Sequence, residues 1–204
     1  MQNLLKSLAG LLFAVLLASI GIIASFGFTR ADATTWPDEG KPSVKIISGD
    51  SQICSFQVPT VLPGANGRIS KKTINAGNRA GILGVRFSPV VNTLGTTGEY
   101  ADGNGDLGAN TEVAVYIDVD TSGDWNTGDV GLKSDGTNYS YPTALDYDAL
   151  DNYSGIGWNA VKSMNASAVY DFIIMWGIPV TVGNEIQGDS VDFDITLVLE
   201  DDVH

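Results

Sequence analysis

The chain has 204 residues, 44% of them hydrophobic, and a formal net charge of −13 at pH 7. This length is enough for one buried core. The acidic balance argues against nucleic acid and anionic lipid as partners. The only histidine is His204, so no Ser–His or Cys–His pair can form inside the fold, and a His-Glu-x-x-His motif is absent. The composition therefore favours a protein that is not an enzyme.

Residues 1–33 have the features of a secretory signal peptide. Lys6 precedes an uncharged, mostly apolar run over residues 7–29. Cleavage is predicted after Ala24, at the end of this run, or after Ala33, where Ala31-Asp32-Ala33 fits the small-x-small rule. A retained anchor is the alternative, because the run is long enough to span a bilayer. We expect an extracellular or cell-surface protein that meets signal peptidase during export and contacts the membrane only through this segment, before cleavage.

Charge is unevenly distributed along the chain. Residues 34–98 carry seven Lys and Arg against three acids, whereas residues 99–204 carry twenty acids against Lys133 and Lys162. Solubility of an exported protein explains this pattern. The alternative is that the basic part of one copy meets the acidic part of the next.

Short alternating runs between turn residues predict an all-β fold with one short helix. Candidate strands are residues 43–47, 53–58, 69–74, 81–87, 112–118, 169–179 and 191–200. The last run alternates apolar residues with acids, which is typical of a half-buried strand, and the run before it is apolar on both faces, as in a central strand. We expect these two to form a hairpin across residues 183–189. The spacing of all the runs favours an antiparallel β-sandwich.

Residues 143–153 break the alternating pattern. Leu145, Ala149, Leu150 and Tyr153 recur at helical spacing, and Gly155 follows them. This predicts the one short helix, covering an edge or an end of a sheet.

The single cysteine, Cys54, has no partner for an intrachain disulfide. It alternates with Phe56 and Val58, which predicts a small buried apolar side chain. An intermolecular bridge is the alternative.

The most specific polar motif follows the predicted strand 112–118. Numbered from Asp118, acids or hydroxyls stand at positions 1, 3, 5 and 12 and a glycine at position 6, as in the twelve-residue calcium loop. The candidate ligands are Asp118, Asp120, Ser122 and Asp129. Position 12 is an aspartate in place of the usual glutamate, and a strand in place of a helix precedes the loop. A hairpin turn that needs no ion is the alternative.

Two further sets of residues are candidate sites. Glu99, Asp102 and Asp106 form a second acidic cluster, which is either another cation site or a solvated loop. Asn138, Asn152 and Asn165 begin Asn-x-Ser motifs and are candidate glycosylation sites.

Several segments, in this order, resemble the TasA/camelysin family of exported bacterial and archaeal surface proteins. They are Ala24-Ser25-Phe26, Leu62-Pro63-Gly64, Ile74-Asn75-Ala76-Gly77, residues 99–108, the loop after Asp118, residues 174–179, residues 183–190 and Phe193-Asp194-Ile195. The resemblance implies a jelly-roll β-sandwich that polymerises into extracellular filaments of biofilm matrix or into bundling pili. Camelysin-like relatives have been labelled metallopeptidases, but the histidines for that activity are absent here.

The resemblance also implies how the chain assembles. In such fibres the N-terminal segment of one subunit completes the sheet of its neighbour, which is β-strand addition. Residues 34–47 are the candidate donor, and residues 48–204 form the sandwich that accepts it. We therefore predict a secreted structural subunit, with other copies of itself as partners and calcium as a possible bound ion. The alternatives are a cell-surface β-sandwich that binds sugar or protein, and, less favoured, a secreted hydrolase using the acidic cluster.

Overall fold

The computed structural model describes residues 44–46, 49–58, 61–95 and 106–201. Contacts divide the chain into two compact units, Met1–Asp32 and Ala33–His204, and all the described residues belong to the second. The predicted signal peptide therefore lies outside the described residues, as does most of the predicted donor. None of the helices in the described residues has the length and apolar character of a membrane-spanning segment.

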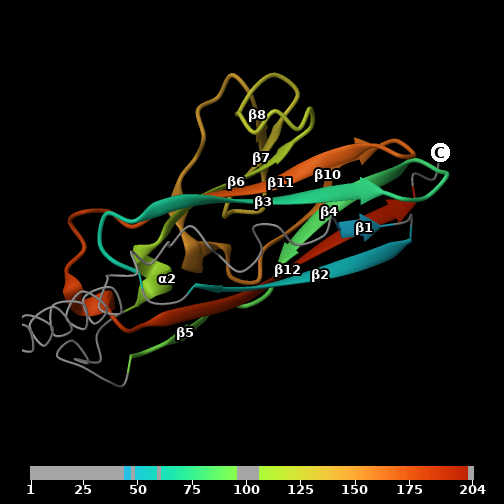
Figure 1. Cartoon of the computed structure of the whole chain (residues 1–204). Coiled ribbons are helices and arrows are strands. Elements are labelled where there is room, and N and C mark those ends of the chain that lie inside the picture. The colour runs from blue at the N-terminus through green and yellow to red at the C-terminus, as the bar shows by residue number, and fades with distance from the viewer. Residues whose placement is uncertain (1–43, 47–48, 59–60, 96–105, 202–204) are drawn as a thin grey trace, which may run out of the picture. The chain divides into compact units, whose positions relative to one another are not determined.

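The second unit consists of two β-sheets packed face to face (Figure 1). Sheet A has the order β1-β3-β11-β6-β7-β8, with β9 paired to β6. Its strands are β1 (Val44–Ile46), β3 (Asn66–Asn75), β6 (Glu112–Asp118), β7 (Val130–Leu132), β8 (Asn138–Ser140), β9 (Asp148–Ala149) and β11 (Val169–Gly177). Sheet B has the order β10-β4-β12-β2, with β5 paired to β12. Its strands are β2 (Asp50–Val58), β4 (Gly81–Phe87), β5 (Val91–Thr93), β10 (Gly157–Met164) and β12 (Ser190–Asp201).

The strand order confirms the predicted fold class. Without β1 and β8 at the two ends of sheet A, and without β5 and β9, which lie off the main strand orders, the two sheets read β3-β11-β6-β7 and β2-β12-β4-β10. Every described pair is antiparallel except β1 with β3. This is the strand order of a jelly roll, an eight-stranded sandwich of two sheets.

The core lies between the sheets and is built from inward-facing residues of every strand except β5, β8 and β9. On sheet B the ring of Phe193 stacks on Phe56 and on Phe87, at 5.3 and 5.6 Å between centroids. The rings of Tyr153 and Trp158 pack against Phe87 from the side. Cys54 is buried in this core, as predicted.

The predicted C-terminal hairpin is wrong, although both of its strands are present. β11 lies between β3 and β6 in sheet A, and β12 lies between β2 and β4 in sheet B. Residues 178–189, which include the 3-10 helix η2 (Asn184–Ile186), connect the two sheets. Each strand has an apolar face that needs covering, and placing the strands in opposite sheets buries both faces in the same core.

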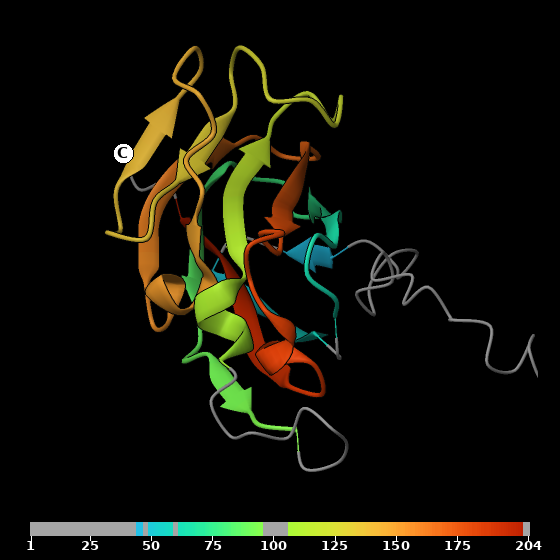
Figure 2. The ribbon, with the colours of Figure 1, turned by 90° about the vertical axis from the view of Figure 1, so that its left-hand side faces the viewer.

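The predicted helix over residues 143–153 is also wrong. Only Leu150–Tyr153 is helical, as the 3-10 helix η1, while Asp148 and Ala149 pair with β6. The Asp148 carboxylate accepts hydrogen bonds from its neighbour's backbone, Ala149 N, and from the Ser134 hydroxyl, and such bonds compete with helix formation. The one α-helix of the described residues is α2 (Leu107–Asn110), which contacts η1 at one end of the sandwich (Figure 2).

Part of the predicted donor segment pairs with its own chain. Val44–Ile46 form β1, which runs parallel to β3 in register with Thr73–Asn75. Ile46 is buried in the core. The remainder of the predicted donor, residues 34–43, lies outside the described residues.

Candidate functional site

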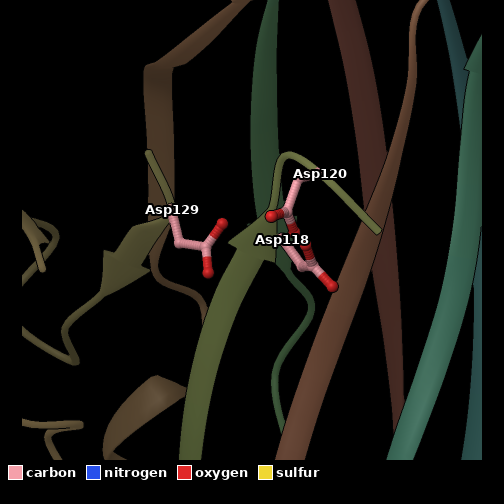
Figure 3. A group of neighbouring side chains, drawn as sticks. All are labelled: Asp118, Asp120 and Asp129. Carbon is pink, nitrogen blue, oxygen red and sulfur yellow. The ribbon is translucent and has the colours of Figure 1, made fainter. Parts of the chain in front are cut away.

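The described residues contain one group of acids that can hold a metal ion, and it lies at the end of β6. Asp118, Asp120 and Asp129 each offer a carboxylate oxygen, and these oxygens lie within 4.8 Å of one another. Figure 3 shows Asp118 and Asp120 at the end of the β6 arrow, with the Asp129 carboxylate turned toward them. The structure thus brings together three of the four predicted ligands.

The turn between β6 and β7 is held closed by its own polar groups. The Asp129 carboxylate accepts hydrogen bonds from Val119 N and Asn126 N, at 3.0 and 2.8 Å. Gly123 N donates to Asp118 Oδ2 at 2.6 Å. Gly123 has a φ of +84°, in the left-handed region that glycine adopts without strain. Ser122 N donates to Asp120 Oδ1 at 3.0 Å, so backbone N–H groups hold all three carboxylates in place.

Ser122, the fourth predicted ligand, lies in the same turn. Its hydroxyl accepts a hydrogen bond from Asn126 Nδ2 at 2.8 Å. The same amide donates to both carboxylate oxygens of Asp120, at 3.3 and 3.2 Å. Asn126 thus links Ser122 to the acidic group, and the role of Ser122 as a ligand stays a prediction.

Burial makes the Asp118 carboxyl the most unusual group of the site. Its side chain is fully buried, and Oδ1 has no hydrogen-bond partner among the described residues. Burial raises the pKa of Asp118, and the adjacent Asp120 carboxyl raises it further. At Asp120, hydrogen bonds from the Ser122 hydroxyl and backbone lower the pKa. A buried carboxylate beside two others is costly unless a cation or a proton neutralises it.

The local architecture differs from that of a helical calcium loop, as the sequence suggested. β6 leads into the turn and β7 begins at Val130, directly after Asp129. The ligands therefore belong to a strand–turn–strand unit on the outer face of sheet A. Ring contacts join this turn to the sheet, because Trp125 packs against Tyr116 and Tyr139 at 5.5 Å between centroids.

The second acidic cluster lies partly outside the described residues, which do not include Glu99 and Asp102. Asp106 is the N-cap of α2 and accepts a hydrogen bond from Ala109 N. The structure adds Asp151, whose pKa is raised by burial and by the neighbouring Asp106. Sequence reasoning missed Asp151 because it lay within the predicted helix.

The three predicted glycosylation sites are all exposed. Asn138 begins β8, Asn152 lies in η1 and Asn165 lies in the turn between β10 and β11. The Asn152 amide donates to Asp148 Oδ1 at 2.7 Å, so a glycan there would replace a hydrogen bond. Attachment of glycan stays a prediction at all three sites.

Neither a protein-family model nor a curated protein matches this sequence. The resemblance to the TasA/camelysin family therefore remains a prediction.

Proposed function

We propose that this protein is a secreted structural subunit that polymerises head-to-tail into extracellular filaments. In this proposal the N-terminal segment of one copy adds a strand to the β-sandwich of the next. The observation that carries the proposal is the open edge of β3, which is the side of Asn66–Ser70 that faces away from β11. β1 pairs only with Thr73–Asn75, and among the described strands none pairs with Asn66–Ser70 on that side. An unpaired edge of this kind is a template for another strand.

The hydrogen bonds of β3 indicate which groups face this edge. Asn75 N and O bond to Ala168 and Ser167, on the β11 side, whereas Ala76 N bonds to Ile46 O, on the β1 side. Since the direction alternates along a strand, the N–H and C=O groups of Arg68 and Ser70 point toward the open edge. These groups are the proposed acceptors of the added strand.

A donor of the proposed kind is available in the sequence. Residues 34–43 precede β1 and belong to the segment that the family resemblance singles out. β1 already runs parallel to β3 at one end of the edge. The same segment from a neighbouring copy would extend that pairing toward Asn66. The contact is heterologous, so it can repeat indefinitely and give a filament.

We further propose that the cation at Asp118, Asp120 and Asp129 is calcium. The candidate ligands are carboxylate and hydroxyl oxygens, which hard cations prefer, and the described residues bring no sulfur or imidazole ligand to the group. Calcium would neutralise the buried Asp118 carboxylate and stabilise the turn. Ser122 would supply a further oxygen.

Asp120→Asn should weaken calcium binding at least about tenfold, because it removes one charged ligand. Asp120 is exposed, so the substitution leaves the core intact. Isothermal titration calorimetry with calcium measures the change in affinity. Asp135→Asn, which neutralises an exposed aspartate in the β7–β8 turn, is the matched control and should bind as the unaltered protein does. Equal binding by the two variants would contradict this assignment.

Ser70→Pro should abolish filaments seen by negative-stain electron microscopy of the mature protein. Proline removes the N–H that points toward the open edge and leaves the β3–β11 hydrogen bonds in place. Ser70→Ala is the matched control, since it removes the same hydroxyl but keeps the N–H, and it should assemble normally. Circular dichroism and urea unfolding establish that both variants are folded.

Filaments formed by folded Ser70→Pro protein would contradict β3 as the acceptor. If the unaltered mature protein stays a stable monomer with and without calcium, the filament proposal itself fails. That outcome would favour the alternative function, a surface binding module. The aromatic cluster of Trp125, Tyr139 and the half-exposed Tyr141 on the outer face of sheet A offers such a module a place to bind sugar.

A further inference from the structure

One residue joins the cation site to the strand that carries the open edge. Gly123 N donates to Asp118 Oδ2, and the carbonyl of Gly123 accepts a hydrogen bond from Arg68 Nη1 at 2.9 Å. Tyr116 Oη donates to the same carbonyl at 3.1 Å. Arg68 belongs to β3, while Asp118 and Tyr116 belong to β6. The turn after β6 therefore contacts β3, although β11 lies between these two strands.

The fit between the turn and Arg68 is close. A Cβ atom at position 123 would lie 2.8 Å from Arg68 Nη1, so the guanidinium packs directly against the glycine backbone. Ile173 on β11 lies between Tyr116 and Ser70 in the register of sheet A, on the outer face. It is nevertheless fully buried. The outer face of sheet A is thus covered here, and the turn is part of the packing.

The closed turn carries an electrostatic cost that a cation would remove. Three carboxylates lie within 4.8 Å of one another, and Asp118 Oδ1 is buried without a hydrogen-bond partner among the described residues. Opening the turn would relieve this repulsion but would also break the Gly123 hydrogen bonds to Asp118 and Arg68. A bound cation would stabilise the closed turn, because the closed turn brings the three carboxylates within reach of one ion.

From these contacts we infer that cation binding at Asp118, Asp120 and Asp129 controls strand addition at β3. The cation holds the turn closed, the Gly123 carbonyl holds Arg68, and Arg68 anchors the part of β3 that β1 does not pair with. An edge strand held only by β11 opens more readily than one tied also to the turn after β6. The inference rests on the proposed assembly at this edge. By linkage, strand addition must in turn raise the affinity for the cation.

Calcium itself is the probe. Three variants separate cation binding from its effect on β3. Asp120→Asn weakens the cation site. Arg68→Gln keeps the site but removes the guanidinium, and Arg86→Gln on β4, whose Nη2 contacts Asn159 Oδ1, is the control for loss of an exposed arginine. Amide hydrogen exchange at Gly67 and Ile69, whose N–H groups face β11, is measured with calcium and with a chelator, at a concentration where the chain is monomeric. Filament formation is then measured at higher concentration.

The expected result is that calcium slows exchange at Gly67 and Ile69 and lowers the critical concentration for filaments about tenfold, a usual size for coupling between two sites. Arg86→Gln should behave in the same way. Arg68→Gln should bind calcium yet lose both effects of calcium. Asp120→Asn should lose both effects at calcium concentrations that saturate the unaltered protein.

Two results in the exchange and binding measurements, and one in the filament measurement, would overturn the inference. One is calcium binding that leaves exchange at β3 unchanged in the unaltered protein, and the other is a full calcium effect in Arg68→Gln. The monomer measurement is independent of assembly. Filaments that form equally with and without calcium would overturn the coupling and leave the proposed function standing. Calcium-dependent protection of β3 in a chain that never assembles would support the link between cation and strand and overturn the proposed function.

Discussion

Replacing Asn75 by alanine should lower the free energy of unfolding by about 3 kcal/mol or more. Asn75 is fully buried at the end of β3. Its Nδ2 lies 2.8 Å from Arg79 O and 3.1 Å from both Met164 O and Asn165 O. Its Oδ1 accepts a hydrogen bond from Gly77 N at 3.0 Å. Alanine removes all of these bonds and leaves buried backbone groups unsatisfied, which costs more than the bonds alone contribute.

Urea unfolding followed by circular dichroism measures this effect, and two variants sharpen its interpretation. Asn75→Asp keeps the shape and the acceptor but cannot donate, so it should be nearly as destabilising as alanine. Asn138→Ala is the matched control, because that exposed amide makes only a 3.5 Å contact with Ala160 O. If Asn75→Ala lowered the free energy of unfolding by less than about 1 kcal/mol, the turn after β3 and the turn between β10 and β11 would be held by other contacts.

A mature protein that begins at Ser43 should fold normally and form no filaments. It lacks residues 34–42, which supply nearly all of the proposed donor, and it keeps β1 and the buried Ile46. Because the described sandwich is intact in this variant, its urea midpoint should match that of the longer protein. Sedimentation and negative-stain electron microscopy at matched concentrations test for assembly.

The control for this truncation replaces residues 34–42 with a Gly/Ser segment of equal length. A flexible segment provides the length of a donor but little tendency to pair as a strand, so it too should remain monomeric. Filaments from either protein would show that assembly uses another part of the chain. If the open edge of β3 is the acceptor, adding the native segment as a separate peptide should protect the β3 amides that face this edge from hydrogen exchange.

The sequence predicts most of the long strands because their periodicity is strong. β4 and β6 have the predicted bounds, and β11 and β12 differ by only one or two residues at their ends. β10 was missed because a register shift between Trp158 and Lys162 interrupts the alternation of its apolar residues. The apolar pattern within a strand does not indicate which sheet the strand joins. Only the structure therefore shows that the two strands of the predicted hairpin lie in opposite sheets.

The candidate cation site was predicted from spacing alone, since its ligands are close in sequence. Asp118, Asp120 and Asp129 come together as the twelve-residue pattern implies. The contact between Arg68 and Gly123 has no sequence signal, because it joins residues on different strands whose distance depends on the sheet order. Asn75 is a similar case, since nothing in the local sequence indicates that its amide serves two distant turns.

The central position of β12 in sheet B determines when that sheet can form. β2, β4 and β5 all pair with β12, so they have no common partner until residues 190–201 have been synthesised. β11 has the same role in sheet A, where it joins β3 to β6. During translation neither sheet can therefore be completed before its central strand has been synthesised, and long-range pairing of this kind makes folding slow.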